Sequence, residues 1–304
     1  MFLNSDVVSE HCYMSDFERK VLESQQRPIV ILQRRSNSPL SSTVAPNQDT
    51  VGVMLPYTPL HYLLLTRLSE SEASSGKNPS SASFILVMTS GNMSDEPIAI
   101  TNQEARDKLD KIVDAYLLHD RPILTRCDDS VIRVFESPNQ DPPNQDPGSE
   151  LPGNNAHLYP IRRSRGYAPA PFSLPAPVPS ILAVGAELKN TFCLSREDYA
   201  FVSQHIGDLS NYETYTAFEN GIEHFKHLFR LNPEYIAHDL HPDYMSTKYA
   251  IERAEQESLQ CIGVQHHHAH IASCMLENNI PAGRKVIGVA FDGTGYGIDR
   301  AIWG

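Results

Sequence analysis

A Pro-rich segment in the second half of the chain limits what the sequence can fold into. Residues 168–180 read APAPFSLPAPVPS, which suits an extended, semi-rigid connection between domains. A chain of 304 residues is long enough for roughly two domains. We therefore expect a first domain at residues 1–167, a Pro-rich linker at residues 168–180 and a second domain at residues 181–304.

Before this linker, short apolar runs alternate with helical stretches. Pro59 is a favourable first residue for a helix through Arg67, and Thr101 with Glu104 forms the capping box of a second helix. The apolar runs predict strands at residues 28–33, 83–90, 115–119, 130–135 and 158–164. The mixture indicates an α/β or α+β domain, with helices over a mixed sheet.

After the linker, the pattern changes to a meander followed by alternating helices and strands. Ser210 and Glu213 are expected to cap the first of these helices, which runs to about Phe229. The strands are predicted at residues 180–186, 190–195, 198–203, 234–239, 259–265 and 285–292, and the later helices at 244–256 and 267–278. This order is typical of the beginning of an actin-like or ribonuclease-H-like fold.

Two polar segments read as insertions in the first domain. Residues 69–83 are rich in serine, and residues 137–153 contain PNQDP twice in tandem. Neither segment has enough apolar side chains to offset the entropy lost on ordering, so both are expected to be solvated loops.

The composition excludes several classes of protein. The five cysteines are odd in number and widely spaced, which argues against CxxC zinc fingers and against a disulfide framework. The N-terminus lacks the features of a signal peptide, and no apolar run is long enough to cross a membrane. We therefore expect a cytoplasmic protein with reduced thiols and no membrane association. The formal net charge of −12 opposes non-specific binding to nucleic acids.

The motif QHHHAH, which follows a predicted strand, is the strongest candidate for a functional site. If the helix begins at His266, then His266 and His270 lie one turn apart on the same face. Their Cβ atoms are then about 5–6 Å apart. Two imidazoles at this spacing can bind one divalent ion, with Asp292 as the candidate third ligand. His267 and His268 are expected to orient neighbouring side chains or to pack against them, and not to bind the ion. The alternative is a surface histidine tract without a ligand role.

Three further motifs are weaker candidates for a ligand site. Gly293 and Gly295 in FDGTGYG let backbone N–H groups approach a phosphate, or they form a Gly-rich hairpin. Ser90 and Asn92 in MTSGNMSDEP offer polar groups where a strand ends, or they belong to a turn. Arg165 in IRRSRGYAPAP belongs to a basic cluster that can clamp a triphosphate or protect a sheet edge.

The motif AHDLHPDY also concentrates polar side chains. It is interpreted either as a second metal site or, preferably, as a capped turn before a helix. Its candidate ligands are His238, Asp239, His241 and Asp243.

Taken together, the motifs resemble a known family. PYTPLHYLLL, LVMTSGNMSDEPI, LLHDRPILTRCDDSVIRV and RRSRGYAPAP resemble the YrdC-like domain of HypF, the hydrogenase-maturation carbamoyltransferases. ILAVGAELKNTFCLS, HDLHPDYMSTKYA, VQHHHAHIASCMLEN and VAFDGTGYGIDRAIWG resemble the TsaD-like domain that follows it in that family. The resemblance implies a mixed α/β chain. A YrdC-like twisted-sheet domain would be followed by the first half of an actin-like, ribonuclease-H-like domain of the TsaD type.

The resemblance also implies a reaction. In the family, an acylphosphatase domain hydrolyses carbamoyl phosphate, and the YrdC-like domain joins the carbamate to ATP to form carbamoyl-adenylate. The TsaD-like domain then passes the carbamoyl group to the C-terminal cysteine of the partner HypE. That group later becomes a cyanide ligand of the nickel–iron centre.

The same resemblance assigns roles to residues, although it leaves the catalytic residues unknown. One divalent metal, zinc or iron, would be bound by His266, His270 and Asp292. Lys189 and Asn190 would belong to the first phosphate hairpin of the second domain. Nucleotide binding is implied for Ser90, Asn92, Arg165, Lys189, Asn190, Gly293, Thr294 and Gly295.

Some domains and motifs of the family's proteins have no counterpart in this sequence. They are the acylphosphatase domain, the paired CxxC motifs, the start of the YrdC-like domain, and the end of the TsaD-like domain with its second aspartate ligand. We therefore expect an internal fragment, with both domains incomplete, that does not run the whole reaction alone. Two alternative functions stay open. The chain could belong to an enzyme of the tRNA threonylcarbamoyladenosine pathway, or it could be a non-catalytic remnant that binds a nucleotide or a metal. RNA binding is a minor expectation.

Overall fold

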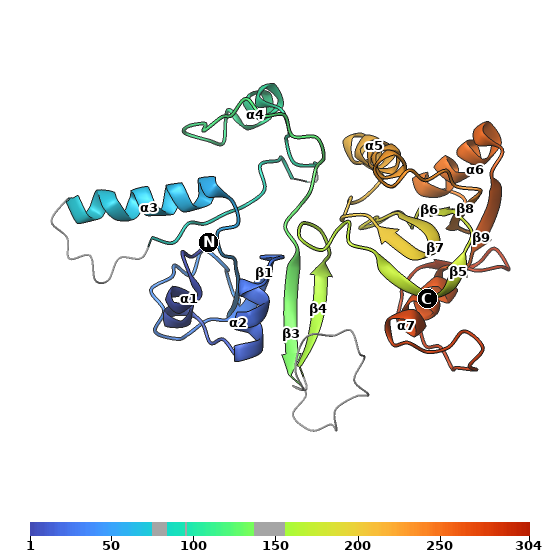
Figure 1. The fold of residues 1–304 in the computed structure, drawn as a ribbon, viewed down its shortest axis with the longest axis horizontal. Coiled ribbons are helices and arrows are strands. Elements are labelled where there is room, and N and C mark those ends of the chain that lie inside the picture. Colours follow the sequence, from blue (N-terminus) through green and yellow to red (C-terminus); the bar gives the residue numbers. More distant parts are fainter. Residues whose placement is uncertain (75–83, 95, 137–155) are drawn as a thin grey trace. The chain divides into compact units, whose positions relative to one another are not determined.

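The computed structural model describes residues 1–74, 84–94, 96–136 and 156–304 (Figure 1). Their contacts form two compact units. The N-terminal unit comprises Met1–Ser90 and Asp129–Tyr167, and the C-terminal unit comprises Gly91–Asp128 and Ala168–Gly304. The tandem PNQDP segment at 137–153 lies outside the described residues.

The N-terminal unit contains a four-stranded mixed sheet in the order β2–β1–β3–β4. β1 is antiparallel to β2 and parallel to β3, which is antiparallel to β4. The strands are β1 (Ile29–Gln33), β2 (Thr50–Val53), β3 (Val131–Glu136) and β4 (Ala156–Arg162). The strands predicted at 28–33, 130–135 and 158–164 are thus confirmed.

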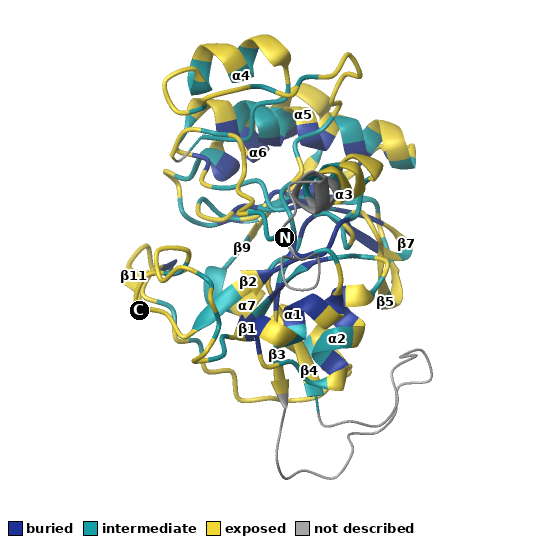
Figure 2. Cartoon of the chain, turned by 90° about the vertical axis from the view of Figure 1, so that its left-hand side faces the viewer, coloured by how far each residue is buried: buried dark blue, intermediate teal, exposed yellow. Residues whose placement is uncertain are grey.

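Two short helices, α1 (Ser5–His11) and α2 (Asp16–Glu23), complete the core of this unit. Ser15 caps α2 in a reciprocal capping box with Glu18. Figure 2 shows the buried residues of α1, α2 and β1 in dark blue. The shared core includes Val8, Leu22, Val30, Leu32 and Ile132, all fully buried.

The helix predicted from Pro59 is longer than expected. α3 (Pro59–Ser74) continues past Arg67, so residues 69–74 of the Ser-rich segment end a helix and are not a loop. The remainder of that segment, residues 75–83, lies outside the described residues.

The C-terminal unit contains a five-stranded sheet in the order β5–β7–β6–β8–β9. β7 pairs antiparallel with both β5 and β6, whereas β6, β8 and β9 are parallel to one another. The strands are β5 (Phe172–Val178), β6 (Ile181–Ala183), β7 (Cys193–Val202), β8 (Tyr235–Asp239) and β9 (Gln260–Val264). The predicted three-strand meander is instead a β6–β7 hairpin with β5 paired to the far side of β7. The parallel strands that follow, joined through helices, confirm the mixed α/β prediction.

The Pro-rich segment expected as a linker provides β5, the edge strand of this sheet. An edge strand tolerates proline, because the missing N–H can face away from the neighbouring strand. The strands predicted at 190–195 and 198–203 are both part of β7, with Glu197 at a φ of 54° between them. One half of β7 pairs with β6 and the other half with β5.

Helices α5 (Tyr212–Phe229) and α6 (Met245–Glu257) cover one face of this sheet (Figure 1). Their core includes Phe192, Leu194, Phe218, Ile222 and Ile236. The N-cap of α5 is Asn211 rather than the predicted Ser210. The Asn211 side chain accepts from two backbone N–H groups of the first turn.

The remaining elements of the unit are α4 (Asn102–Leu109), α7 (His266–Glu277), β10 (Gly295–Tyr296) and β11 (Ile302–Trp303). Thr101 caps α4 as predicted, but the Glu104 side chain accepts the N–H of Ile100 and does not complete the predicted capping box with Thr101. α4 buries no residue and is drawn without dark blue in Figure 2. Across the described residues, none of the helices has both the length and the apolar composition needed to span a bilayer.

Three apolar runs that predict strands do not form them. The described residues 84–90, 115–119 and 285–292 have no strand assignment. Several of their side chains are exposed, and Ile287 is 96% and Phe291 100% accessible. An apolar run becomes a strand only where neighbouring backbone pairs with it over several residues. Among the described residues, Leu86 donates its N–H to the Met1 carbonyl and accepts from the Met1 amino group, but no longer ladder forms along these three runs.

Candidate metal centre

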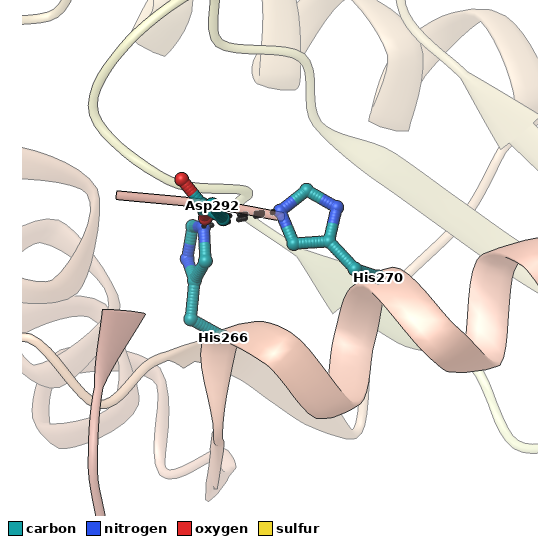
Figure 3. Close-up of side chains that lie close together, drawn as sticks. All are labelled: His266, His270 and Asp292. Carbon is teal, nitrogen blue, oxygen red and sulfur yellow. Dashed lines mark hydrogen bonds and ion pairs between the residues drawn. The ribbon is translucent and has the colours of Figure 1, made fainter. Parts of the chain in front are cut away.

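The histidine cluster is placed by the transition from β9 to α7. Gln265 is the N-cap of α7, and its side-chain oxygen accepts the N–H of His268 at 2.8 Å. The helix therefore begins at His266, one residue earlier than the predicted start at 267. Because His270 follows one turn later, both imidazoles project from the same side of the helix (Figure 3).

Asp292 meets these two imidazoles. Its Oδ2 lies 2.8 Å from Nε2 of His266 and 3.4 Å from Nε2 of His270, and the two Nε2 atoms are 3.2 Å apart (Figure 3). Bonds of about 2.0–2.2 Å to a tetrahedral ion would place ligand atoms roughly 3.3–3.5 Å apart. The His270–Asp292 and His266–His270 distances are close to this spacing, and the His266–Asp292 pair would have to open by about half an ångström. Two imidazoles and one carboxylate are ligand types that suit a divalent ion such as zinc or iron.

The surroundings of Asp292 favour its ionised form. Burial alone would raise the pKa of this carboxyl group, but the N–H of Thr294 and the nearby imidazoles of His266, His270 and His267 lower it. The Thr294 N–H lies 3.4 Å from Asp292 Oδ1. A carboxylate must be deprotonated to bind a metal, so this environment suits a ligand.

The other two histidines of the motif lie differently. His267 packs against Gly295, where an added Cβ would lie 2.5 Å from its Nε2, and its ring is 6.4 Å from that of Trp303. Its Nε2 is 3.8 Å from Asp292 Oδ2. His268 is exposed.

The Gly-rich motif forms a small hairpin beside the candidate ligands. β10 and β11 pair antiparallel, and the N–H of Gly297 donates to the Ala301 carbonyl at 2.8 Å. Gly293 and Thr294 are exposed next to Asp292, whereas Gly295 is buried. Phosphate binding by this loop stays a prediction.

A cavity of about 440 Å³ is lined in part by two members of the triad, His266 and His270. Residues of β6, β7, β8, β9 and α7 line it, together with residues of the β6–β7 connection. They include Gly185, Thr191, Asp239, His266 and His270. The carboxyl ends of parallel strands commonly line ligand sites.

Lys189 and Asn190 lie in the β6–β7 connection but do not line this cavity. The Lys189 N–H donates to Asp208 Oδ1 at 2.7 Å. Asn190 is 2% exposed, and its amide donates to the carbonyls of Val184 and Ala186. These residues brace the hairpin, and their contact with a nucleotide stays a prediction.

Arg165 uses its guanidinium inside the N-terminal unit. Its Nε donates to Asp129 Oδ1 at 2.6 Å, and its Nη atoms donate to the carbonyls of Gln26 and Arg27 at 3.1 and 2.7 Å. The group also lies 3.4 Å from the centre of the Tyr57 ring. Three of its five N–H donors are therefore already engaged.

Ser90 and Asn92 of the MTSGNMSDEP motif fall in different units. Ser90 is exposed at the end of the first segment of the N-terminal unit. Asn92 belongs to the C-terminal unit, where its side-chain amide donates to the carbonyls of Met93 and Glu96. Their roles in nucleotide binding stay predictions.

The structure adds Asp239 to the centre. This residue ends β8, is 8% exposed, and has Oδ2 at 2.6 Å from Nδ1 of His266. Sequence reasoning assigned it to a capped turn or a separate metal site. The available signal was its place at the carboxyl end of a strand parallel to the one that precedes His266.

Two family models match the chain. One, described as "Telomere recombination" and covering Sua5, YciO and YrdC proteins, matches residues 1–141. The other, described as "HypF Kae1-like domain", matches residues 176–277.

Curated relatives agree with these models. Carbamoyltransferase HypF2 of Cupriavidus necator is 43% identical over 288 residues, which is 94% of this chain and 34% of the relative. Carbamoyltransferase HypF of Synechocystis sp. is 40% identical over 305 residues, covering 100% of this chain and 35% of the relative. The chain thus spans about a third of the length of the curated relatives it matches.

Two solved structures share the fold and the sequence. Full-length HypF in its phosphate- and nucleotide-bound form is 44% identical with a TM-score of 0.81, covering 100% of this chain and 42% of that one. HypF of T. kodakarensis is 37% identical with a TM-score of 0.82, covering 100% of this chain and 35% of that one. Over the residues that it has, the chain belongs to the family of HypF carbamoyltransferases.

Proposed function

We propose that this chain supplies nucleotide- and metal-binding parts of a carbamoyltransferase that acts in nickel–iron hydrogenase maturation. Carbamate, derived from carbamoyl phosphate, reacts with ATP to give carbamoyl-adenylate and pyrophosphate. The carbamoyl group then passes to the thiol of the C-terminal cysteine of a HypE-type acceptor, and AMP leaves. Family membership supports this assignment, since the matched relatives are named carbamoyltransferases.

The convergence of His266, His270 and Asp292 is the observation that carries the proposal. These three residues would hold one divalent ion, zinc or iron, which supplies a Lewis acid and an anchor for the acyl nucleotide. The protein contributes the geometry, because one helical turn sets the two imidazoles and the lowered pKa of Asp292 keeps its carboxylate ionised.

The remaining predicted residues would bind the nucleotide. In the N-terminal unit, Arg165 would stabilise the departing pyrophosphate with its remaining N–H donors, and Ser90 of the same unit would also contact the nucleotide. In the C-terminal unit, exposed backbone N–H groups of the Gly293–Gly295 loop suit a phosphate beside the triad. Asn92, Lys189 and Asn190 complete the set that we propose. We propose a cytoplasmic location, in which free thiols such as the five cysteines of this chain persist.

Metal binding by the 304-residue chain tests the centre directly. Purified wild type is expected to bind one equivalent of zinc or iron, measured by elemental analysis, and His266→Ala/His270→Ala is expected to lose it. His268→Ala is the matched control, because His268 belongs to the same motif but is exposed. Equal metal content in wild type and the double variant would contradict the ligand assignment.

The reaction is tested by carbamate- and carbamoyl-phosphate-dependent exchange between ATP and pyrophosphate. We expect exchange from a version of the chain extended at both ends with the flanking segments of a full-length relative, and none from the 304-residue chain alone. No exchange from the extended version would contradict the enzymatic proposal. Acceptor assays then compare a HypE-type C-terminal cysteine peptide with tRNA, and transfer to tRNA alone would favour the threonylcarbamoyladenosine pathway.

A further inference from the structure

The DLHPDY motif lies next to the candidate metal centre and has no role in the proposed reaction. Its first residue, Asp239, ends β8, and its side chain is only 6% exposed. The adjoining His266 side chain is 16% exposed. Because little water reaches these groups, hydrogen bonds between them are strong, and an unpaired polar atom there would be costly.

Both oxygens of the Asp239 carboxylate are occupied. Oδ1 accepts the backbone N–H of His241 at 2.8 Å, which closes the turn at the start of the motif. Oδ2 lies 2.6 Å from Nδ1 of His266. Carboxylate oxygens accept hydrogen bonds, as Oδ1 does here, so the second contact assigns Nδ1 of His266 as the donor.

A proton on Nδ1 decides what the opposite ring nitrogen can do. Nε2 of His266 is the atom that faces Asp292 and His270. In a neutral imidazole with its hydrogen on Nδ1, the lone pair lies on Nε2, where it can bind a metal.

We propose that Asp239 is a positioning residue that holds His266 in the Nδ1–H form, with Nε2 directed at the metal. This inference rests on the metal centre of the proposed function and extends it to a residue that binds no metal itself. The DLHPDY turn then has two connected roles. It shapes the entry to α6, and it fixes the orientation of a ligand on α7.

The substitution Asp239→Asn tests this role with little change in shape. The amide has one oxygen and one NH₂ group, whereas the site presents two N–H donors, from His241 and His266. If the NH₂ group faces His241, two donors oppose each other and the turn is lost. If it faces His266, Nδ1 must become the acceptor, and the proton moves to the metal-facing Nε2.

The primary measurement is the zinc affinity of the 304-residue chain, determined by competition with a chromophoric chelator. We expect Asp239→Asn to weaken binding by about 10–100-fold, the usual effect of removing a carboxylate behind a histidine ligand. Asp243→Asn is the matched control, because Asp243 lies on the same loop but is exposed, and its zinc affinity should equal that of wild type. Unchanged affinity in Asp239→Asn would overturn the proposal.

A second measurement does not depend on how well the variant folds. In wild-type chain labelled with ¹⁵N-histidine, His266 should show a one-bond N–H signal from Nδ1, identified by its loss in His266→Gln. An Nδ1 without a proton would overturn the positioning role even if zinc binds. A wild type that binds no zinc would instead contradict the proposed metal centre, and the Nδ1 signal would then decide the role of Asp239 by itself.

Discussion

Gly185 is a position where the backbone requires glycine. It has a φ of 71°, and a Cβ there would collide with the carbonyl oxygen of Thr191. We expect Gly185→Ala to lower the free energy of unfolding of the C-terminal unit by about 2 kcal/mol, because strain and the collision add. Urea denaturation checks this. Gly293→Ala is the control, since no described residue other than its chain neighbours lies within 4 Å of its Cβ position. A similar loss there would contradict the argument.

Glu104 gives the clearest pH dependence. Burial alone would raise its pKa, but the N–H of Ile100 at 3.0 Å and the cations of Arg126 and Lys108 lower it below the ordinary 4.5. A carboxyl group with a lowered pKa stabilises the fold fully above its unfolded pKa of 4.5, and this contribution is lost as pH falls through the lower folded value.

We therefore expect Glu104→Gln to cost about 1 kcal/mol at neutral pH, and the difference from wild type to shrink progressively as the pH falls below 4.5. Urea denaturation as a function of pH measures both effects. Glu255→Gln, an exposed glutamate of α6, should behave like wild type throughout. A difference between Glu104→Gln and wild type that is the same at every pH would show that the ionised form has no special role.

At the scale of elements, Asn211 and Ser210 are the two candidate N-cap residues at the start of α5. Asn211 Oδ1 accepts the N–H groups of Glu213 and Thr214 at 2.9 and 3.1 Å, whereas Ser210 is exposed and lies one position earlier. We expect Asn211→Ala to cost about 1 kcal/mol of stability, the usual loss of an N-cap. Thermal denaturation measures this loss, and Ser210→Ala should leave the stability unchanged. A larger loss of stability in Ser210→Ala than in Asn211→Ala would identify Ser210 as the cap.

The predicted elements differ in reliability for a physical reason. Helices such as α5, α6 and α7 depend on contacts within one or two turns, so their spacing and caps locate them to within a few residues. Strands depend on a partner from elsewhere in the chain. The runs at 115–119 and 285–292 are apolar enough for strands but remain unpaired among the described residues. The Pro-rich segment at 168–180 does form one, because β7 pairs with it.

At the scale of the whole molecule, each unit has its own buried core. Phe218 is fully buried in the C-terminal unit and packs edge-to-face against Phe192 and Tyr249. Phe218→Ala should cost about 3–5 kcal/mol, since it removes a large side chain from a packed core. Hydrogen exchange should then accelerate in β6 and β8 of that unit, while β1 of the N-terminal unit keeps its protection. Equal acceleration in β1 would show that the chain unfolds as one cooperative unit.

The sequence alone determined the mixed α/β class, the family resemblance and the pairing of His266 with His270. These depend on local spacing, since 3.6 residues per turn places i and i+4 on one helix face. Only the tertiary structure decided that Asp239 lies behind His266 and that the guanidinium of Arg165 is engaged by Asp129. Such contacts join residues far apart in the chain. Which of them form depends on how strands pair and loops return, and no local pattern encodes that choice.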